Sequence, residues 1–491
     1  MTQTYLLGID VGTSAIKAVL FDSHGHEVHS SCRASKIYND GACSEMDMNE
    51  LWQDVAITIK NVTGKMASGS TIAAAAVSGQ GEGLWLIDNE GAPVGRAILW
   101  NDNRAEQLVR NINTSPVLNE QIRKITGSSL FPGATSVLLR WMQENSPKQL
   151  DQAHKLLFCK DWIRFKLTGV IGTDITDTST SLTDIKKSEP TDALFDHLKI
   201  GKQLPLIPLI FKPDDQAGTI SNEAAESTGL PRGMPVAIGA FDVAASAAGC
   251  GTIHDGDACV ILGTSGCTIV VSDTLTDDLK SLSGKENHVI PNQFITVTAT
   301  MAATPNIDWV YNLFHTEKTF ADVEEELQSI PAGCHGLIYH PYISSSGERA
   351  PFYAPGASAQ FSGINEKTTP LTMTRAVYEG VAFSIKDCLR HQKPERLFLA
   401  GGGARSSFWA HLIANCTGLP IFLSTETELC ARGSALMAGT AAGIYKNLEH
   451  AVDHLSEPQR IDPDPDQVSI YEDLFKQYRQ IQKAMMPIWT S

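Results

Sequence analysis

Two short segments place hydroxyl, backbone N–H and charged groups where a phosphate could bind. In the first, DVGTSAIK, a Gly-Thr-Ser turn lies between apolar runs at residues 5–9 and 16–21. This strand–turn–strand pattern predicts a hairpin whose tip exposes N–H groups and hydroxyls without a bulky side chain. Asp10 supplies a carboxylate suited to hydrated Mg²⁺, although an ordinary glycine hairpin explains this segment alone equally well. The predicted phosphate-contacting residues are Thr13, Ser14 and Lys17.

The same frame recurs in the second half of the chain. Residues 258–272, ACVILGTSGCTIVVS, again have an apolar run, a Gly-Thr-Ser turn and a β-branched run. Two such hairpins indicate two related halves, each offering one phosphate-binding turn to a shared cleft. The turn residues are Gly263, Thr264 and Ser265.

A loop at residues 98–105, ILWNDNRA, combines an indole, amides, an acid and a guanidinium. Polyhydroxylated substrates need donors and acceptors for vicinal hydroxyls and an apolar face for C–H groups. Trp100 can supply that face. The polar edge would come from Gln80, Glu82, Asp102 and Arg104.

Two further segments join a strand to a helix. Asp242 follows the apolar run at 237–241 and precedes small helix formers, a position where an acid is commonly an N-cap. The helix N-terminus would keep its carboxylate ionised and able to accept a proton. Three glycines at 401–403 follow a predicted strand at 396–400 and precede a predicted helix at 408–416, so adenine or ribose could lie against bare backbone.

In this order the segments resemble the FGGY carbohydrate kinase family. The resemblance is carried by DVGTSAIK, FDVAASAAG at 241–249, AQFSGINEKTTPLTMTRAVYEG at 359–380 and AGGGARSSFW at 400–409. It spans about residues 5–445 and is closest to the pentulose kinases, L-xylulose kinase among them. It implies an α/β fold of two actin/hexokinase-like (ribonuclease H-like) ATPase domains around a central cleft. We expect a sugar-binding domain at residues 1–246 and a nucleotide-binding domain at 247–491.

The resemblance also implies roles for single residues. Asp242 matches the family's general base, and Trp100, Asp102 and Arg104 match its sugar-binding W-x-D-x-R segment. The family's adenosine motif falls on Gly402, Gly403, Ser406 and Asn415. The implied reaction is phosphorylation of a ketopentose such as xylulose, with ATP and Mg²⁺.

Composition restricts the classes of function. The chain has 491 residues, 42% of them hydrophobic, which is typical of a globular protein large enough for two domains. Its net charge of −16 argues against nucleic acid as a partner, because phosphate backbones require clustered Lys and Arg. No apolar stretch reaches the roughly 18 residues of a membrane helix, and no signal-peptide pattern occurs. We therefore expect a cytoplasmic protein with no membrane partner; its oligomeric state is open, with a homodimer as one candidate.

Other functions compete with a ketopentose kinase. Polyol kinases of the erythritol or glycerol type are rivals, as are gluconate-type kinases, which should need extra basic groups near the acceptor. A non-catalytic actin-fold ATPase is a rival of another class, but it would not need the Asp242 segment or the Trp100 loop. A P-loop kinase is excluded because no G-x-x-x-x-G-K-[ST] motif occurs.

Overall fold

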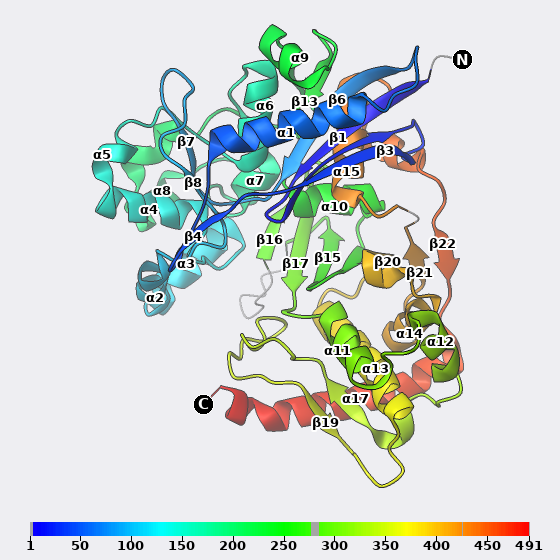
Figure 1. Cartoon of the computed structure of the whole chain (residues 1–491). Coiled ribbons are helices and arrows are strands. Elements are labelled where there is room, and N and C mark those ends of the chain that lie inside the picture. Colours follow the sequence, from blue (N-terminus) through cyan, green and yellow to red (C-terminus); the bar gives the residue numbers. More distant parts are fainter. Residues whose placement is uncertain (1–2, 276–283, 425, 491) are drawn as a thin grey trace.

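Two mixed β-sheets form the frame of the molecule (Figure 1). The computed structural model describes residues 3–275, 284–424 and 426–490. The first sheet has the strand order β12-β13-β6-β1-β2-β3, and the second has the order β16-β17-β15-β14-β20-β21-β22. The strands of the first are β1 (Thr4–Val11), β2 (Ala15–Phe21), β3 (Glu27–Ala34), β6 (Thr71–Gly79), β12 (Gln216–Thr219) and β13 (Pro235–Ala237). Those of the second are β14 (Asp257–Leu262), β15 (Gly266–Ser272), β16 (Gly284–Asn287), β17 (Phe294–Ala299), β20 (Arg396–Ala400), β21 (Ile421–Leu423) and β22 (Gln459–Ile461).

The two sheets repeat one pairing scheme. β1 pairs antiparallel with β2 across the first Gly-Thr-Ser turn and parallel with β6. β14 likewise pairs antiparallel with β15 across the second turn and parallel with β20. The predicted α/β fold of two related halves is therefore confirmed. Both turns lie at the carboxyl end of a central parallel strand, where open α/β sheets bind their ligands.

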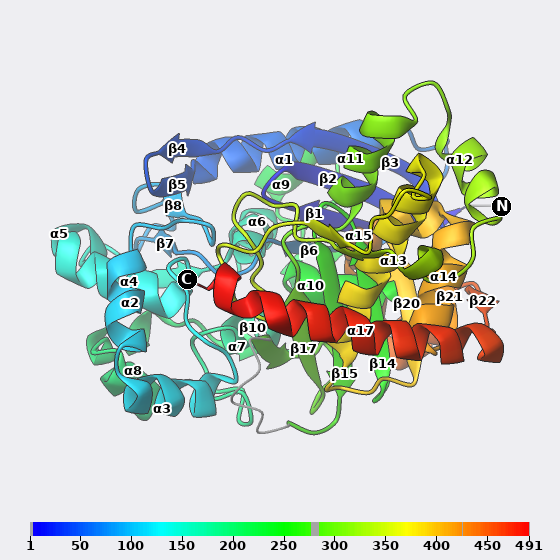
Figure 2. The same ribbon diagram turned by 90° about the horizontal axis from the view of Figure 1, so that it is seen from below.

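Helices cover the outer face of each sheet. On the first sheet, α1 (Met48–Thr63), α6 (Cys159–Thr168) and α9 (Asn222–Thr228) bury Leu7, Ile9 and Val11 of β1. On the second sheet, α11 (Thr304–Phe314), α13 (Pro370–Leu389), α14 (Ser407–Thr417) and α17 (Pro465–Trp489) pack over β14 and β20. Figure 2 shows α17 running along this side of the second half. Among the described residues, no helix combines the length and apolarity needed to cross a membrane.

A helical lobe extends from the first half (Figure 1). Its separate apolar core is built from residues between 84 and 200. Its helices are α2 (Glu106–Asn113), α3 (Pro116–Thr126), α4 (Thr135–Asn145), α5 (Pro147–Leu150) and α8 (Asp192–His197). Short strands lie at its base: β4 (Tyr38–Asp40), β5 (Cys43–Met46), β7 (Trp85–Ile87), β8 (Ala97–Ile98) and β9 (Lys155–Leu157). The remaining short elements are α7 (Ile175–Ser179), α12 (Phe320–Leu327), α16 (Leu448–Asp453), β10 (Thr173–Asp174), β11 (Ile210–Phe211), β18 (Ile338–His340) and β19 (Gln360–Ser362).

Two helices, α10 (Asp242–Cys250) and α15 (Leu429–Ala441), cross between the sheets (Figure 1). One apolar cluster joins both helices to the inner faces of the two sheets. A Cβ added at Gly433 would lie 1.9 Å from the Ala245 carbonyl oxygen, so the backbones approach more closely than any larger residue permits. The boundary predicted between residues 246 and 247 falls inside α10, within this shared cluster, and that division stays a prediction.

Candidate active site

A cavity of about 490 Å³ lies where the two halves meet. Residues 81–131 and 241–243 line it from the first half, and residues 284–299 and 349–353 line it from the second. Three acids, an arginine and aromatic side chains face this space: Glu82, Asp242, Glu286, Arg349, Trp100, Phe131, Phe241 and Tyr353. An apolar wall with a few convergent polar groups is the usual composition of a small-molecule site.

Asp242 begins α10 at the cavity wall. Its Oδ1 accepts a hydrogen bond from the Val243 N–H at 2.8 Å. The N-cap position belongs to Phe241, so the expected N-cap role of Asp242 is wrong. Burial, with a smaller contribution from the charge of Asp10, raises the pKa of Asp242 to about 7. The helix N-terminus therefore does not keep the pKa of this carboxyl low, as we had expected. The carboxyl can exchange a proton near neutral pH.

Glu82 and Glu286 add two more acids to the wall. Glu82 Oε2 accepts hydrogen bonds from Thr135 N–H at 2.7 Å, Thr135 Oγ1 at 2.6 Å and Ser181 Oγ at 2.9 Å. Its Oε1 and Glu286 Oε2 have no hydrogen-bond partner among the described residues. Burial, and then the nearby charges of Glu82 and Asp242, raise the pKa of Glu286 to about 8. The two carboxyl groups therefore keep hydrogen-bonding capacity that the described residues do not use.

The predicted sugar loop meets the first phosphate turn. Trp100 Nε1 donates to Thr13 Oγ1 at 2.9 Å, and Thr13 Oγ1 donates to Gln80 Oε1 at 3.0 Å. Trp100 remains 37% exposed and lines the cavity, which suits the apolar face expected of it. The structure thus brings together Thr13, Gln80 and Trp100, which the sequence places far apart.

Asp102 and Arg104 lie apart from the lining of the cavity. Asp102 is 0% exposed, and its two oxygens accept from Ser44 N–H and from the N–H, Nε and Nη2 of Arg104 at 2.7–2.9 Å. Arg104 Nη2 also donates to Glu45 Oε1 at 2.7 Å. These four accepted hydrogen bonds use all the acceptor sites of the Asp102 carboxylate. Direct contact of either side chain with a sugar stays a prediction, and it would require this ion pair to open.

Arg349 and Glu286 were not among the predicted site residues. Arg349 Nε donates to the Ala299 carbonyl at 3.0 Å, and Glu348 Oε1 accepts from Met301 N–H at 2.9 Å. These bonds hold the loop at residues 340–353 beside β17. The SSSGER sequence of that loop was a usable signal for Arg349. The GKEN sequence of β16 has nothing that marks Glu286, since its position depends on how the halves meet.

The residues predicted to bind the metal and the first phosphate lie at the first turn. Burial, opposed by a hydrogen bond from Cys430, raises the pKa of Asp10 to about 6. Lys17 Nζ is 2.7 Å from Glu428 Oε2, which belongs to the other half. Among the described residues, no cluster of three or more His, Cys, Asp or Glu side chains forms a metal cage. A single carboxylate fits Mg²⁺, because this ion keeps several waters and binds substrate phosphates.

The residues predicted to bind the adenosine lie in two separate places. A Cβ at Gly403 would lie 2.8 Å from Leu262 Cβ, so the glycine turn adjoins the second Gly-Thr-Ser turn. A Cβ at Gly402 would meet nothing within 4 Å, and Ser406 caps α14 by accepting from Trp409 N–H at 2.9 Å. Asn415 lies nine residues further along α14, roughly 13 Å away, and accepts from Asp464 N–H at 2.8 Å. The structure does not bring Asn415 to the glycine turn.

Comparison with known proteins identifies the family of this chain. The chain is 31% identical to erythritol kinase of Brucella abortus, over 99% of this chain and 97% of that protein. It is 29% identical to a xylulose kinase of Staphylococcus epidermidis, over 99% of this chain and 100% of the relative. The crystal structure of gluconate kinase from Lactobacillus acidophilus superposes with a TM-score of 0.90 at 26% identity, covering 99% of both chains. Residues 5–249 match the N-terminal domain and residues 258–442 the C-terminal domain of the FGGY family of carbohydrate kinases, and the chain belongs to this family.

Proposed function

We propose that this carbohydrate kinase transfers the γ-phosphoryl group of ATP to a hydroxyl of a small, uncharged, open-chain sugar, a ketopentose such as L-xylulose. The observation that carries the proposal is the wall formed by the carboxyl groups of Glu82, Asp242 and Glu286. Hydroxyl groups can donate to each of these acids. The raised pKa values of Asp242 and Glu286 show that a negative charge is already disfavoured in this space, so a carboxylated substrate would bind at a cost, although Arg349 also lines the cavity.

Each residue has a defined part in this reaction. Asp242 takes the proton of the attacking hydroxyl, the substrate oxygen bonds to the γ-phosphorus, and the bond to the β–γ bridging oxygen breaks to release ADP. Asp10 is the residue that would hold Mg²⁺ through water, and such an ion supplies positive charge beside the triphosphate. The groups proposed to contact the nucleotide are Thr13, Ser14, Lys17, Gly263, Thr264, Ser265, Gly402, Gly403 and Ser406.

A polyol of the erythritol type is the second candidate acceptor. It is favoured by the 31% identity to erythritol kinase, which exceeds the identity to the xylulose kinase described above. Erythritol also lacks a charge and offers only hydroxyl groups. The same acidic wall would therefore accept it.

A coupled assay of ADP release over D- and L-xylulose, ribulose, erythritol, glycerol and gluconate tests the proposal. We expect the highest kcat/KM for a ketopentose, the next for erythritol, and the lowest for gluconate. Asp242→Asn, assayed on the best acceptor, is the control for chemistry at this site. If gluconate were the best acceptor, the interpretation of the acidic wall would be wrong although the family would stand.

A further inference from the structure

The direction of the Asp242 side chain depends on its backbone. Among the described residues, the hydrogen bond that its carboxylate accepts comes from the adjacent Val243 N–H. No neighbouring side chain in the described part of the chain is bonded to it. A contact that fixes the backbone at Phe241 therefore also fixes the direction of the Asp242 carboxylate toward the cavity.

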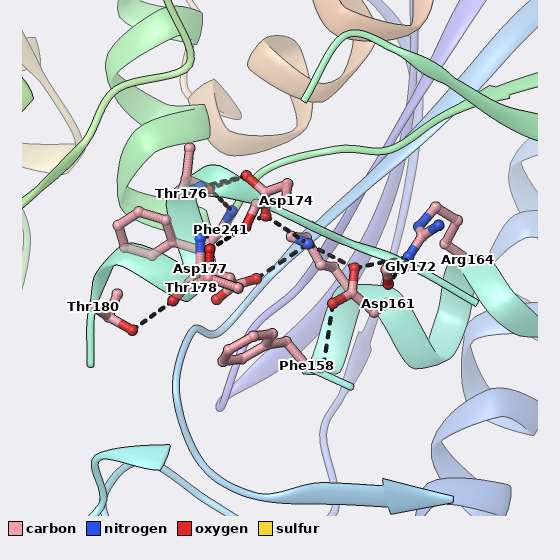
Figure 3. A network of polar contacts seen from close by, with 12 residues as sticks. Phe158, Asp161, Arg164, Gly172, Asp174, Thr176, Asp177, Thr178, Thr180 and Phe241 are labelled. Atoms are coloured by element: carbon pink, nitrogen blue, oxygen red, sulfur yellow. Dashed lines mark hydrogen bonds and ion pairs between the residues drawn. The ribbon is translucent and has the colours of Figure 1, made fainter. Parts of the chain in front are cut away.

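The hydroxyl of Thr176 in α7 holds that backbone (Figure 3). Phe241 N–H donates to Thr176 Oγ1 at 3.1 Å. Thr176 Oγ1 donates in turn to Asp174 Oδ2 at 2.5 Å, and Thr176 N–H donates to the same oxygen at 2.7 Å. Because an ionised carboxylate only accepts, the hydroxyl hydrogen points to Asp174 and leaves a lone pair for Phe241 N–H.

A buried ion network anchors Asp174. Lys160 Nζ lies 2.8 Å from Asp174 Oδ1, 2.7 Å from Asp161 Oδ1 and 3.2 Å from Asp177 Oδ2. These side chains are at most 1% exposed, and Arg164 Nη2 contacts Asp161 Oδ1 at 3.0 Å. Burial raises the pKa of Asp177 far above its usual range. These contacts tie Asp174 to α6 through Lys160.

The network lies directly behind the cavity wall. A Cβ added at Gly81 would be 3.1 Å from Asp177 Oδ1 and 3.0 Å from the Phe241 ring. Gly81 and Phe241 both line the cavity. A movement of α7 would therefore displace Phe241, which lines the cavity.

We propose that Thr176 is a positioning residue, whose hydroxyl, oriented by Asp174 and Lys160, fixes the Phe241–Asp242 backbone and so aims the Asp242 carboxylate at the substrate. This inference rests on the proposed role of Asp242. It gives α7 a part in catalysis without contact with any substrate.

Three variants test it: Thr176→Val, which keeps the shape and removes the hydroxyl; Thr176→Ser, which restores the hydroxyl; and Thr178→Val. Thr178 is the matched control, because it is 0% exposed in the same helix and its hydroxyl donates to the Asp174 carbonyl at 2.8 Å. We expect Thr176→Val to lower kcat by about 10- to 100-fold while the sugar KM stays within about threefold, as for a misplaced catalytic group. Thr176→Ser should recover most of kcat, and Thr178→Val should stay near the wild type.

Amide hydrogen exchange gives a readout that does not depend on turnover. The Phe241 N–H should exchange faster in Thr176→Val than in Thr178→Val, because only the first variant removes its acceptor. Equal kcat losses in the two valine variants, or no rescue by serine, would overturn the inference. So would failure of Thr176→Val to fold while Thr176→Ser and Thr178→Val fold, since the hydroxyl would then serve folding. Normal turnover of Asp242→Asn would instead reject the proposed function, whatever Thr176 does.

Discussion

At the scale of single residues, Asp242 is the proposed general base, and its burial raises its pKa. Replacing it with Asn removes proton acceptance but keeps the shape. We expect kcat to fall by about 10²–10⁴ while ATP affinity stays nearly unchanged. Steady-state kinetics with calorimetric titration of ATP would measure both. Turnover near that of the wild type would show that another group takes the proton.

The raised pKa of Asp242 also predicts how the stability of the folded protein depends on pH. Between the ordinary value of 3.8 and about 7, this carboxyl is ionised in the unfolded chain but protonated in the folded protein. Unfolding then releases a proton, so the contribution of this residue to stability falls as pH rises through that window. Asp242→Asn should therefore have a higher Tm than the wild type at pH 8, and the difference should shrink toward pH 4. A Tm difference independent of pH would contradict the assignment.

A sequence pattern cannot distinguish two roles for Asp102, which are to hold the Trp100 loop in place and to contact the sugar directly. If it holds the Trp100 loop through Arg104, Asp102→Ala leaves a largely buried guanidinium with Glu45 as its one acid partner among the described residues. We expect a loss of about 3 kcal/mol in the free energy of unfolding, with a higher sugar KM as a consequence of the displaced loop. Chemical denaturation and kinetics on the same preparation measure both. An unchanged Tm with a KM raised about 10- to 100-fold would instead support direct contact with the sugar.

At the scale of elements, local patterns predicted the frame well. The two Gly-Thr-Ser hairpins, the strand at 396–400 and the following helix agree with β1–β2, β14–β15, β20 and α14, because each depends on contacts between neighbours in the sequence. Glu286 was missed because the cavity forms only when two distant parts of the chain meet, whereas Arg349 was missed although the SSSGER sequence offered a signal for it. Contact of Asn415 with the nucleotide stays a prediction, because its side chain lies further along α14 and accepts from Asp464 N–H.

The glycine turn after β20 offers a test of the nucleotide site. At Gly402 an added Cβ meets no atom within 4 Å, so Gly402→Val should fold normally and weaken ATP binding by filling space proposed for the nucleoside. Sugar binding should not change. At Gly401 the backbone has φ of 83° and a Cβ would lie 2.7 Å from the Leu262 carbonyl, so Gly401→Val should lower Tm. Titration of ATP into both variants checks this, and unchanged ATP affinity in Gly402→Val would place the nucleoside elsewhere.

At the scale of the whole molecule, the two halves are joined by the crossing of α10 and α15. A Cβ at Gly433 would lie 1.9 Å from the Ala245 carbonyl oxygen, and one at Gly8 would lie 1.8 Å from the Ala431 carbonyl oxygen. α15 is therefore confined on one side by α10 and on another by β1. Since Asp242 begins α10 and Asp10 is the penultimate residue of β1, this packing also sets the separation of the proposed base from the proposed metal-binding acid.

Gly433→Ala tests whether this crossing holds the site together. The added methyl meets backbone on both Ala245 and Gly249, which cannot rotate away as a side chain can, so α15 must shift. We expect a loss of about 3 kcal/mol or more in the free energy of unfolding, at or above the upper end for overpacking, and a lower kcat in the protein that remains folded. Gly402→Ala is the matched control, because the same methyl there meets open space. Urea unfolding and turnover of the two variants would decide the matter: if Gly433→Ala matched the control in both, the helix crossing would be loose enough to move, and the distance from Asp242 to Asp10 would have to be set by other contacts.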